Sequence, residues 1–196
     1  MSVEKTVKPA KVVKSVKTVT PVKAKVKKYD GENPMRTVRI EKVILSASAV
    51  AESLAKSKKL IEIISGMKAK VVASRKRIPA FDVRPGLEVG VCVTVRDKAA
   101  MELLARLLGA VDNKINKKSV SENHFSFGIE EYIEIPGMEY QRDIGVRGLN
   151  VTADFVRAGL RVKRKKIKGS NVPKRQHVPA SEIIKFMEAQ FKTAFI

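Results

Sequence analysis

Residues 87–96 read LEVGVCVTVR, a stretch in which two kinds of side chain alternate strictly. Every second position from 89 to 95 is valine, and the positions between them are small or polar: Gly90, Cys92, Thr94 and Arg96. This period of two is typical of a β-strand that buries one face and leaves the other open. Thr94 and Arg96 offer hydrogen-bond donors suited to phosphate or ribose. We therefore expect a sheet with a core on one side and an open face that can admit a helix or nucleic acid on the other.

Further strands and helices are predicted on both sides of this stretch. Runs rich in apolar and β-branched residues predict strands over 38–45, 69–74, 124–129, 132–135 and 149–156. Helical spacing predicts helices over 52–65, from Asp97 as N-cap to Gly109, and from Ser181 as N-cap through Phe195. Because strands and helices mix without strict βαβ alternation, the predicted fold class is α+β.

Positive charge is concentrated at the two ends of the chain. The 196 residues include 40 Lys and Arg against 20 Asp and Glu, a formal net charge of +20. Nine lysines against two acidic residues give residues 1–30 a charge of +7, and ten basic against two acidic residues give 161–196 a charge of +8. This asymmetry predicts a basic arm at 1–32, a folded α+β domain at 33–160, and a basic loop with a C-terminal amphipathic helix at 161–196. We expect a polyanionic partner that contacts both ends.

The first basic end is predicted to be an extended or disordered arm. Lysines recur at every third position from Lys5 to Lys17, among Val, Thr and Pro residues that form helices poorly. Two interpretations stay open. The arm either releases counterions as it orders along phosphates, or it is a solvated tail without a specific role.

The second basic end is predicted to be a loop and not a helix. Residues 161–176 contain no acidic side chain and include Gly169 and Pro173. A predicted strand precedes them and a predicted helix follows, which favours a docked RNA contact over a solvated surface. The candidate RNA-binding cations in this segment are Arg161, Lys163, Arg164, Lys165, Lys166 and Lys168.

The sequence offers little for catalysis or for metal binding. The single cysteine excludes an internal disulfide, and with only two histidines it cannot complete a zinc site of nitrogen and sulfur ligands. Cys92 is interpreted as a packing residue rather than a nucleophile, and Glu130, Glu131 and Glu134 as a solvated strand edge rather than a metal cluster. There is no phosphate-binding loop and no catalytic triad pattern. We predict a protein that is not an enzyme and has no cofactor and no metal.

Targeting signals are also missing from the sequence. No stretch approaches the roughly 20 apolar residues of a membrane helix. The N-terminus has neither a signal-peptide core nor the bias of a mitochondrial presequence. The expectation is a protein with no membrane partner, in the cytoplasm or the nucleus.

Four motifs, taken together, resemble a known family. They are NPMRTVRIEKVIL at 33–45, the basic hairpin SRKRIPAFDVRPG with its exit strand VCVTVR, FSFGIEEYIEI at 125–135, and DIGVRGLNV at 143–151. Their order and spacing resemble the universal large-subunit ribosomal protein that binds 5S rRNA, in its eukaryotic and archaeal form. The resemblance covers nearly all of residues 33–191 and leaves 1–32 outside.

The resemblance implies a mainly antiparallel sheet with helices on one side and an open face that holds 5S rRNA in the central protuberance, among neighbouring ribosomal proteins. It also implies contacts with large-subunit rRNA and a location in the cytosolic large subunit, with nuclear or nucleolar passage during assembly. By position, Thr94 and Arg96 lie on the 5S-facing strand, and Arg36, Arg39 and Lys42 lie in the basic segment near rRNA. The hairpin loop would face peptidyl-site tRNA through Ser74, Arg75, Lys76, Arg77, Ile78, Pro79 and Ala80.

This chain departs from the family pattern at four positions. Ser46 stands where the family usually has Asn, Ala51 and Asp97 stand where it has Gly, and Met67 stands where it has Gln. Two other classes of function are weighed against this one. A Lys-rich chromatin-type DNA-binding protein is suggested by the arm but not by the balanced, strand-rich middle. An RNA-modifying enzyme would need a cofactor loop or an acid/base pair, and the sequence has neither.

Overall fold

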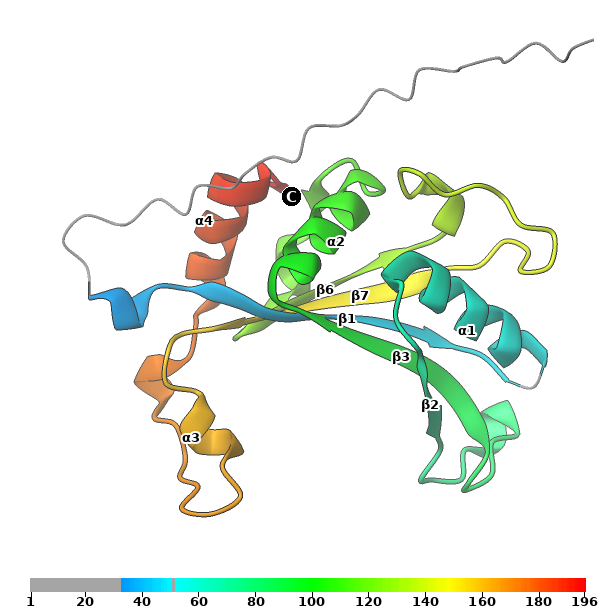
Figure 1. The fold of residues 1–196 in the computed structure, drawn as a ribbon, viewed down its shortest axis with the longest axis horizontal. Coiled ribbons are helices and arrows are strands. Elements are labelled where there is room, and N and C mark those ends of the chain that lie inside the picture. The colour runs from blue at the N-terminus through cyan, green and yellow to red at the C-terminus, as the bar shows by residue number, and fades with distance from the viewer. Residues whose placement is uncertain (1–32, 51) are drawn as a thin grey trace, which may run out of the picture.

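The computed structural model describes residues 33–50 and 52–196 (Figure 1). The predicted arm at 1–32 and the departure at Ala51 lie outside the described residues. The described chain forms an α+β fold around one six-stranded antiparallel sheet. The α+β prediction is confirmed.

The strand predicted at 87–96 lies next to the middle of this sheet. The spatial order is β2 (Lys70–Ala73), β3 (Glu88–Arg96), β1 (Arg39–Ser48), β7 (Leu149–Val156), β6 (His124–Ile129) and β5 (Val120–Ser121). A separate parallel pair joins β4 (Lys114–Ile115) to β8 (Ala194–Phe195).

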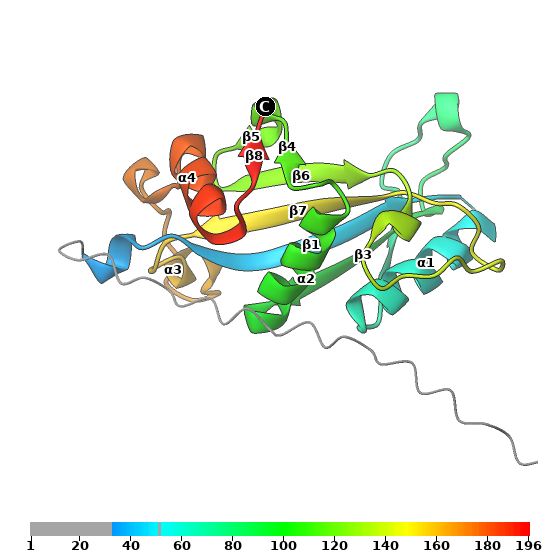
Figure 2. The ribbon, with the colours of Figure 1, turned by 90° about the horizontal axis from the view of Figure 1, so that it is seen from above.

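Three helices cover one face of the sheet and leave the other open. They are α1 (Glu52–Ser65), α2 (Asp97–Gly109) and α4 (Ala180–Phe191), and they lie together on one side in Figures 1 and 2. A fourth, one-turn helix, α3 (Arg161–Arg164), lies on the opposite side. The short 3-10 helices are η1 (Pro34–Arg36), η2 (Pro79–Phe81), η3 (Lys117–Ser119), η4 (Tyr132–Glu134) and η5 (Lys174–Gln176).

The core fills the space between the sheet and these helices. The alternating valines of β3 contribute Val91, Val93 and Val95, each at most 4% exposed, whereas Thr94 and Arg96 are exposed. Leu104 and Met187, from α2 and α4, are fully buried in the same cluster. The alternation in LEVGVCVTVR therefore correctly predicts which side of the sheet faces the core.

Several elements differ in kind from their prediction. The loop predicted over 161–176 contains one helical turn at α3 and a 3-10 turn at η5, because Gly169 and Pro173 prevent a long helix but not a single turn. The 132–135 stretch is the 3-10 helix η4 and not a strand, since Tyr132 turns into the core and its hydroxyl accepts a hydrogen bond from the N–H of Gln141 at 2.8 Å.

The ends of two helices also differ from prediction. Asp97 is the first residue of α2, in the left-handed region at φ 61°, and not an N-cap with a side-chain bond. Pro179, and not Ser181, precedes α4. This helix ends where Lys192 turns left-handed at φ 55°, so Phe195 belongs to β8 and not to the helix.

Candidate RNA-binding surface

Strand register brings the open-face side chains of four strands into cross-strand rows. One row lies toward the β2–β3 hairpin and consists of Cys92, Ser46, Asn150 and Gly128. The next row consists of Thr94, Ile44, Thr152 and Ser126. The last row consists of Arg96, Lys42, Asp154 and His124. Apart from Ile44, the first two rows consist of small or polar residues, and the last row consists of charged residues and a histidine, so the open face offers many hydrogen-bonding groups.

Beyond the first row, the sheet separates into two ribbons. Pairing between β1 and β7 ends at Ser46 and Asn150, while β1 continues along β3 and β7 continues along β6. A hollow of about 470 Å³ opens there, lined in part by Ser48, Gly128 and Gly148.

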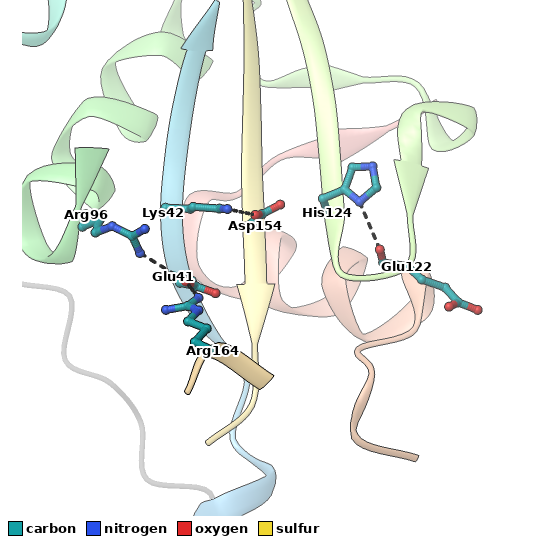
Figure 3. Close-up of polar contacts among 7 residues, drawn as sticks. All are labelled: Glu41, Lys42, Arg96, Glu122, His124, Asp154 and Arg164. Atoms are coloured by element: carbon teal, nitrogen blue, oxygen red, sulfur yellow. Dashed lines mark hydrogen bonds and ion pairs between the residues drawn. The ribbon is translucent and has the colours of Figure 1, made fainter. Parts of the chain in front are cut away.

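The last row is held by an ion pair (Figure 3). The Lys42 ammonium lies 2.9 Å from the Asp154 carboxylate, with both side chains about a quarter exposed, at 26% and 27%. His124 closes the row on β6, and its Nδ1 lies 3.1 Å from the backbone carbonyl oxygen of Glu122. One of the predicted rRNA-binding cations is therefore already neutralised by a neighbouring strand.

Glu41 joins two more of the predicted cations. A bulge between Ile40 and Lys42 makes Glu41 the extra residue of β1. Its Oε1 accepts a hydrogen bond from Nη1 of Arg96 at 3.2 Å and forms an ion pair with Nη2 of Arg164. The Glu41 side chain is 10% exposed, whereas both arginine side chains are 50% exposed. The carboxylate lies beneath two guanidinium groups that still reach solvent.

Two basic segments project past the open face, on the side away from α1 and α2 (Figure 1). At one end is α3 with the residues that follow it, in which every residue from 161 to 170 is exposed. At the other end is the β2–β3 hairpin loop, closed by backbone hydrogen bonds between Ile78 and Val83 at 2.9 and 3.1 Å. Phe81, at the tip of this loop, is 73% exposed.

The structure brings some of the predicted site residues together and separates others. Lys42, Thr94, Arg96 and Arg164 gather on or beside the open face. Arg36 and Arg39 lie at η1 and at the start of β1. Exposed in or after α3 are Arg161, Lys163, Lys165, Lys166 and Lys168. The tRNA-contact candidates Ser74, Arg75, Lys76, Arg77, Ile78, Pro79 and Ala80 lie in the hairpin at the opposite end of the sheet from α3.

Three of the departures from the family pattern can be placed. Ser46 lies on the open face between Cys92 and Asn150. Met67 follows α1 and is 43% exposed, and its N–H donates to Ser65 Oγ at 3.2 Å. Asp97 begins α2, where its positive φ is a conformation that glycine adopts without cost.

The two carboxylates of this surface are not predicted from the sequence. The alternation in 149–156 places Asp154 on a polar face but does not identify it as the partner of Lys42, because pairing depends on register between distant strands. For Glu41 one signal is available: it is the acidic residue within the basic stretch from Arg36 to Lys42. A lone carboxylate among cations indicates an ion pair, since an unpaired one would oppose a polyanion.

The described ranges offer no site for a metal ion and no membrane span. Residues 33–50 and 52–196 contain no group of three or more His, Cys, Asp or Glu side chains that could hold a metal ion. Within the same residues, the helices are too short or too polar to span a bilayer.

Comparison with known proteins identifies relatives. The model of the C-terminal part of the ribosomal L5 family matches residues 88–178. The large ribosomal subunit protein uL5 of Nanoarchaeum equitans is 39% identical over 168 residues, covering 84% of this chain and 99% of that protein. The proteins of the same name from Sulfurisphaera tokodaii and Archaeoglobus fulgidus are 36% and 33% identical, covering 84% and 83% of this chain and 95% and 93% of theirs.

Proposed function

The chain belongs to the uL5 family of large ribosomal subunit proteins, and from this premise we propose that it binds 5S rRNA with the open face of its sheet. As a member of this family it is a structural constituent of the large ribosomal subunit and is located on the ribosome. The family consists of ribosomal proteins and not of enzymes.

One observation carries the 5S proposal: the helices cover one side of the sheet, and the open polar face on the other side is flanked by the exposed basic segment at 161–168. A folded RNA can lie across such a face with its phosphates reaching this segment. Thr94 and Arg96 would contact phosphate or ribose from the open face. The cations of α3 and the residues after it would supply much of the affinity through counterion release.

The remaining partners are proposed by position. Arg36 and Arg39 lie at one end of β1 and would contact large-subunit rRNA. The hairpin loop at 74–80 projects from the opposite end of the sheet and would reach peptidyl-site tRNA. Neighbouring ribosomal proteins of the central protuberance complete the proposed surroundings, and nucleolar passage during assembly belongs to the same proposal.

The test is a competition binding assay with the full chain at about 150 mM salt, where nonspecific binding is suppressed. Labelled 5S rRNA is challenged with unlabelled 5S rRNA, tRNA and length-matched duplex DNA. We expect 5S rRNA alone to compete well. Equal competition by all three would contradict 5S binding as a specific function and would favour the alternative, a Lys-rich chromatin-type DNA-binding protein.

A further inference from the structure

Glu41 has a place on this surface that the proposed function does not explain. It is an acidic residue within a surface that is proposed to bind a polyanion, on a chain with a net charge of +20. A carboxylate repels phosphate, so considered as a charge alone Glu41 would weaken RNA binding. Its contacts indicate the opposite role.

The Glu41 carboxylate is covered by the groups that would meet the RNA. Its side chain is 10% exposed, and Arg96 and Arg164 share its Oε1 (Figure 3). Each guanidinium carries several N–H donors in a fixed plane, and half of each arginine side chain remains exposed. A phosphate can therefore approach the outer donors while Glu41 holds the inner ones.

The same carboxylate connects α3 to the sheet. This helix buries no residue. Its segment is closed at the base, where Arg157 Nη1 donates to the Arg175 carbonyl oxygen at 3.1 Å and Gln176 donates to that of Ala158. Across the described residues, the ion pair of Arg164 with Glu41 is the side-chain polar contact between α3 and the sheet. Without it, the basic segment would be tied only at its base.

We infer that Glu41 is a positioning residue for RNA: it fixes the guanidinium groups of Arg96 and Arg164 at one point and thereby docks the basic segment at 161–168 against the open face. Two guanidinium groups around one carboxylate leave a net positive charge, and a phosphate can neutralise it. The binding part of this inference rests on the proposed 5S function, and the docking part does not.

The docking part is tested without RNA, by limited trypsin digestion of the full chain. Glu41→Gln removes the charge and keeps the shape of the side chain, and it should raise the cleavage rate at Lys163, Lys165 and Lys166 several-fold. The matched control is Glu102→Gln, which makes the same charge change at an exposed position of α2, on the other side of the sheet. The control should be cut like the unsubstituted chain. A cleavage rate unchanged in Glu41→Gln would overturn the inference.

The binding part is tested by titration with 5S rRNA and with a length-matched RNA duplex at about 150 mM salt. In Glu41→Gln, Arg96 and Arg164 lose the orientation that directs their charge-assisted contacts at phosphate. The affinity of this variant for 5S rRNA should therefore fall about tenfold. Duplex binding should stay level or rise, because the variant is more positive. Glu102→Gln should weaken neither. Glu41→Gln binding 5S rRNA as tightly as Glu102→Gln would overturn the positioning role.

A second variant separates this effect from a general loss of folding. Arg164→Gln alters an exposed helix with no buried residue, so its thermal unfolding should match that of the unsubstituted chain. It should nevertheless reproduce the faster cleavage of the segment and part of the 5S loss, and adding Glu41→Gln should not increase the cleavage further. Additive effects would contradict a shared contact. If the unsubstituted chain shows no preference for 5S rRNA, the proposed function fails, and the digestion still decides whether Glu41 docks the segment.

Discussion

Arg96 combines an exposed charge with a fixed orientation, because Glu41 holds its Nη1 at 3.2 Å. Replacing Arg96 by Lys keeps the charge but loses the planar fork that suits bidentate phosphate contacts. We expect the dissociation constant for 5S rRNA to rise about tenfold, as for the loss of one charged hydrogen bond. Titration at constant salt measures it, with Lys98→Gln as a control that removes an exposed neighbouring charge. If Arg96→Lys binds 5S rRNA as tightly as the control does, Arg96 is not part of the interface.

Substitutions at Asp97 test whether the start of α2 requires the left-handed backbone conformation. At φ 61° an alanine side chain is strained, an aspartate less so, and glycine not at all. Asp97→Ala should therefore unfold at lower urea concentration than Asp97→Gly, by about 1 kcal/mol in the free energy of unfolding. Lys98→Ala, one residue further on, should change that free energy by less than about 0.5 kcal/mol. Equal stability of the Ala and Gly variants would show that the left-handed conformation is not required.

Single residues show which part of this surface the sequence can predict. Thr94 and Arg96 are found because alternation within one strand fixes the face of each side chain. The pairs Lys42 with Asp154 and Glu41 with Arg164 are not found, because they depend on strand register, on a bulge and on where a loop returns. None of these is encoded within a window of a few residues.

The hairpin loop between β2 and β3 is an element whose function can be separated from 5S binding. It lies at the far end of the sheet from α3, so it should contact a different partner. Replacing Arg75, Lys76 and Arg77 by Ala should leave the 5S affinity nearly unchanged while slowing translation by ribosomes that carry the variant. A triple variant at the exposed Lys56, Lys59 and Lys68 removes the same charge elsewhere and should not slow translation. A large loss of 5S affinity in the loop variant would place the loop against 5S rRNA instead.

Elements with long periodic patterns are predicted well, and short ones are not. Long patterns predict the strands at 87–96 and 149–156 and the helix at 52–65, because each pattern repeats over several alternations or turns. These elements match β3, β7 and α1. The 132–135 stretch alternates like a strand for only four residues, and tertiary packing of Tyr132 makes it a 3-10 helix instead. Residues 194–195 form a strand because they pair with β4. No local sequence pattern predicts this pairing.

If the chain binds 5S rRNA as proposed, the distribution of charge along it predicts that affinity and specificity come from different segments. The middle of the chain, at 31–160, carries +5 of the total and supplies the shaped face, whereas the ends carry +15. Contacts of Lys and Arg with phosphates depend on salt and hardly on sequence, while contacts from the face of a sheet depend on the fit of the RNA. Specificity for 5S rRNA should therefore persist when the N-terminal end, residues 1–30, is removed, although the affinity falls.

Deleting residues 1–30 tests this division and decides between the two interpretations of the arm. The deletion removes nine lysines against two acidic residues. If the lysines lie along phosphates, a plot of log affinity against log salt should flatten by roughly 0.7 to 0.9 for each phosphate that is no longer neutralised, because fewer counterions are released. The 5S affinity is measured at several salt concentrations, beside a variant whose arm has the same composition in scrambled order.

The scrambled arm should keep the full slope, since neutralising phosphates needs charge and not a particular order of residues. A slope that the deletion leaves unchanged would mean that the arm is a solvated tail. A slope that falls on scrambling would mean instead that the partner reads the order of residues in the arm, and the division between affinity from the ends and specificity from the sheet would then fail.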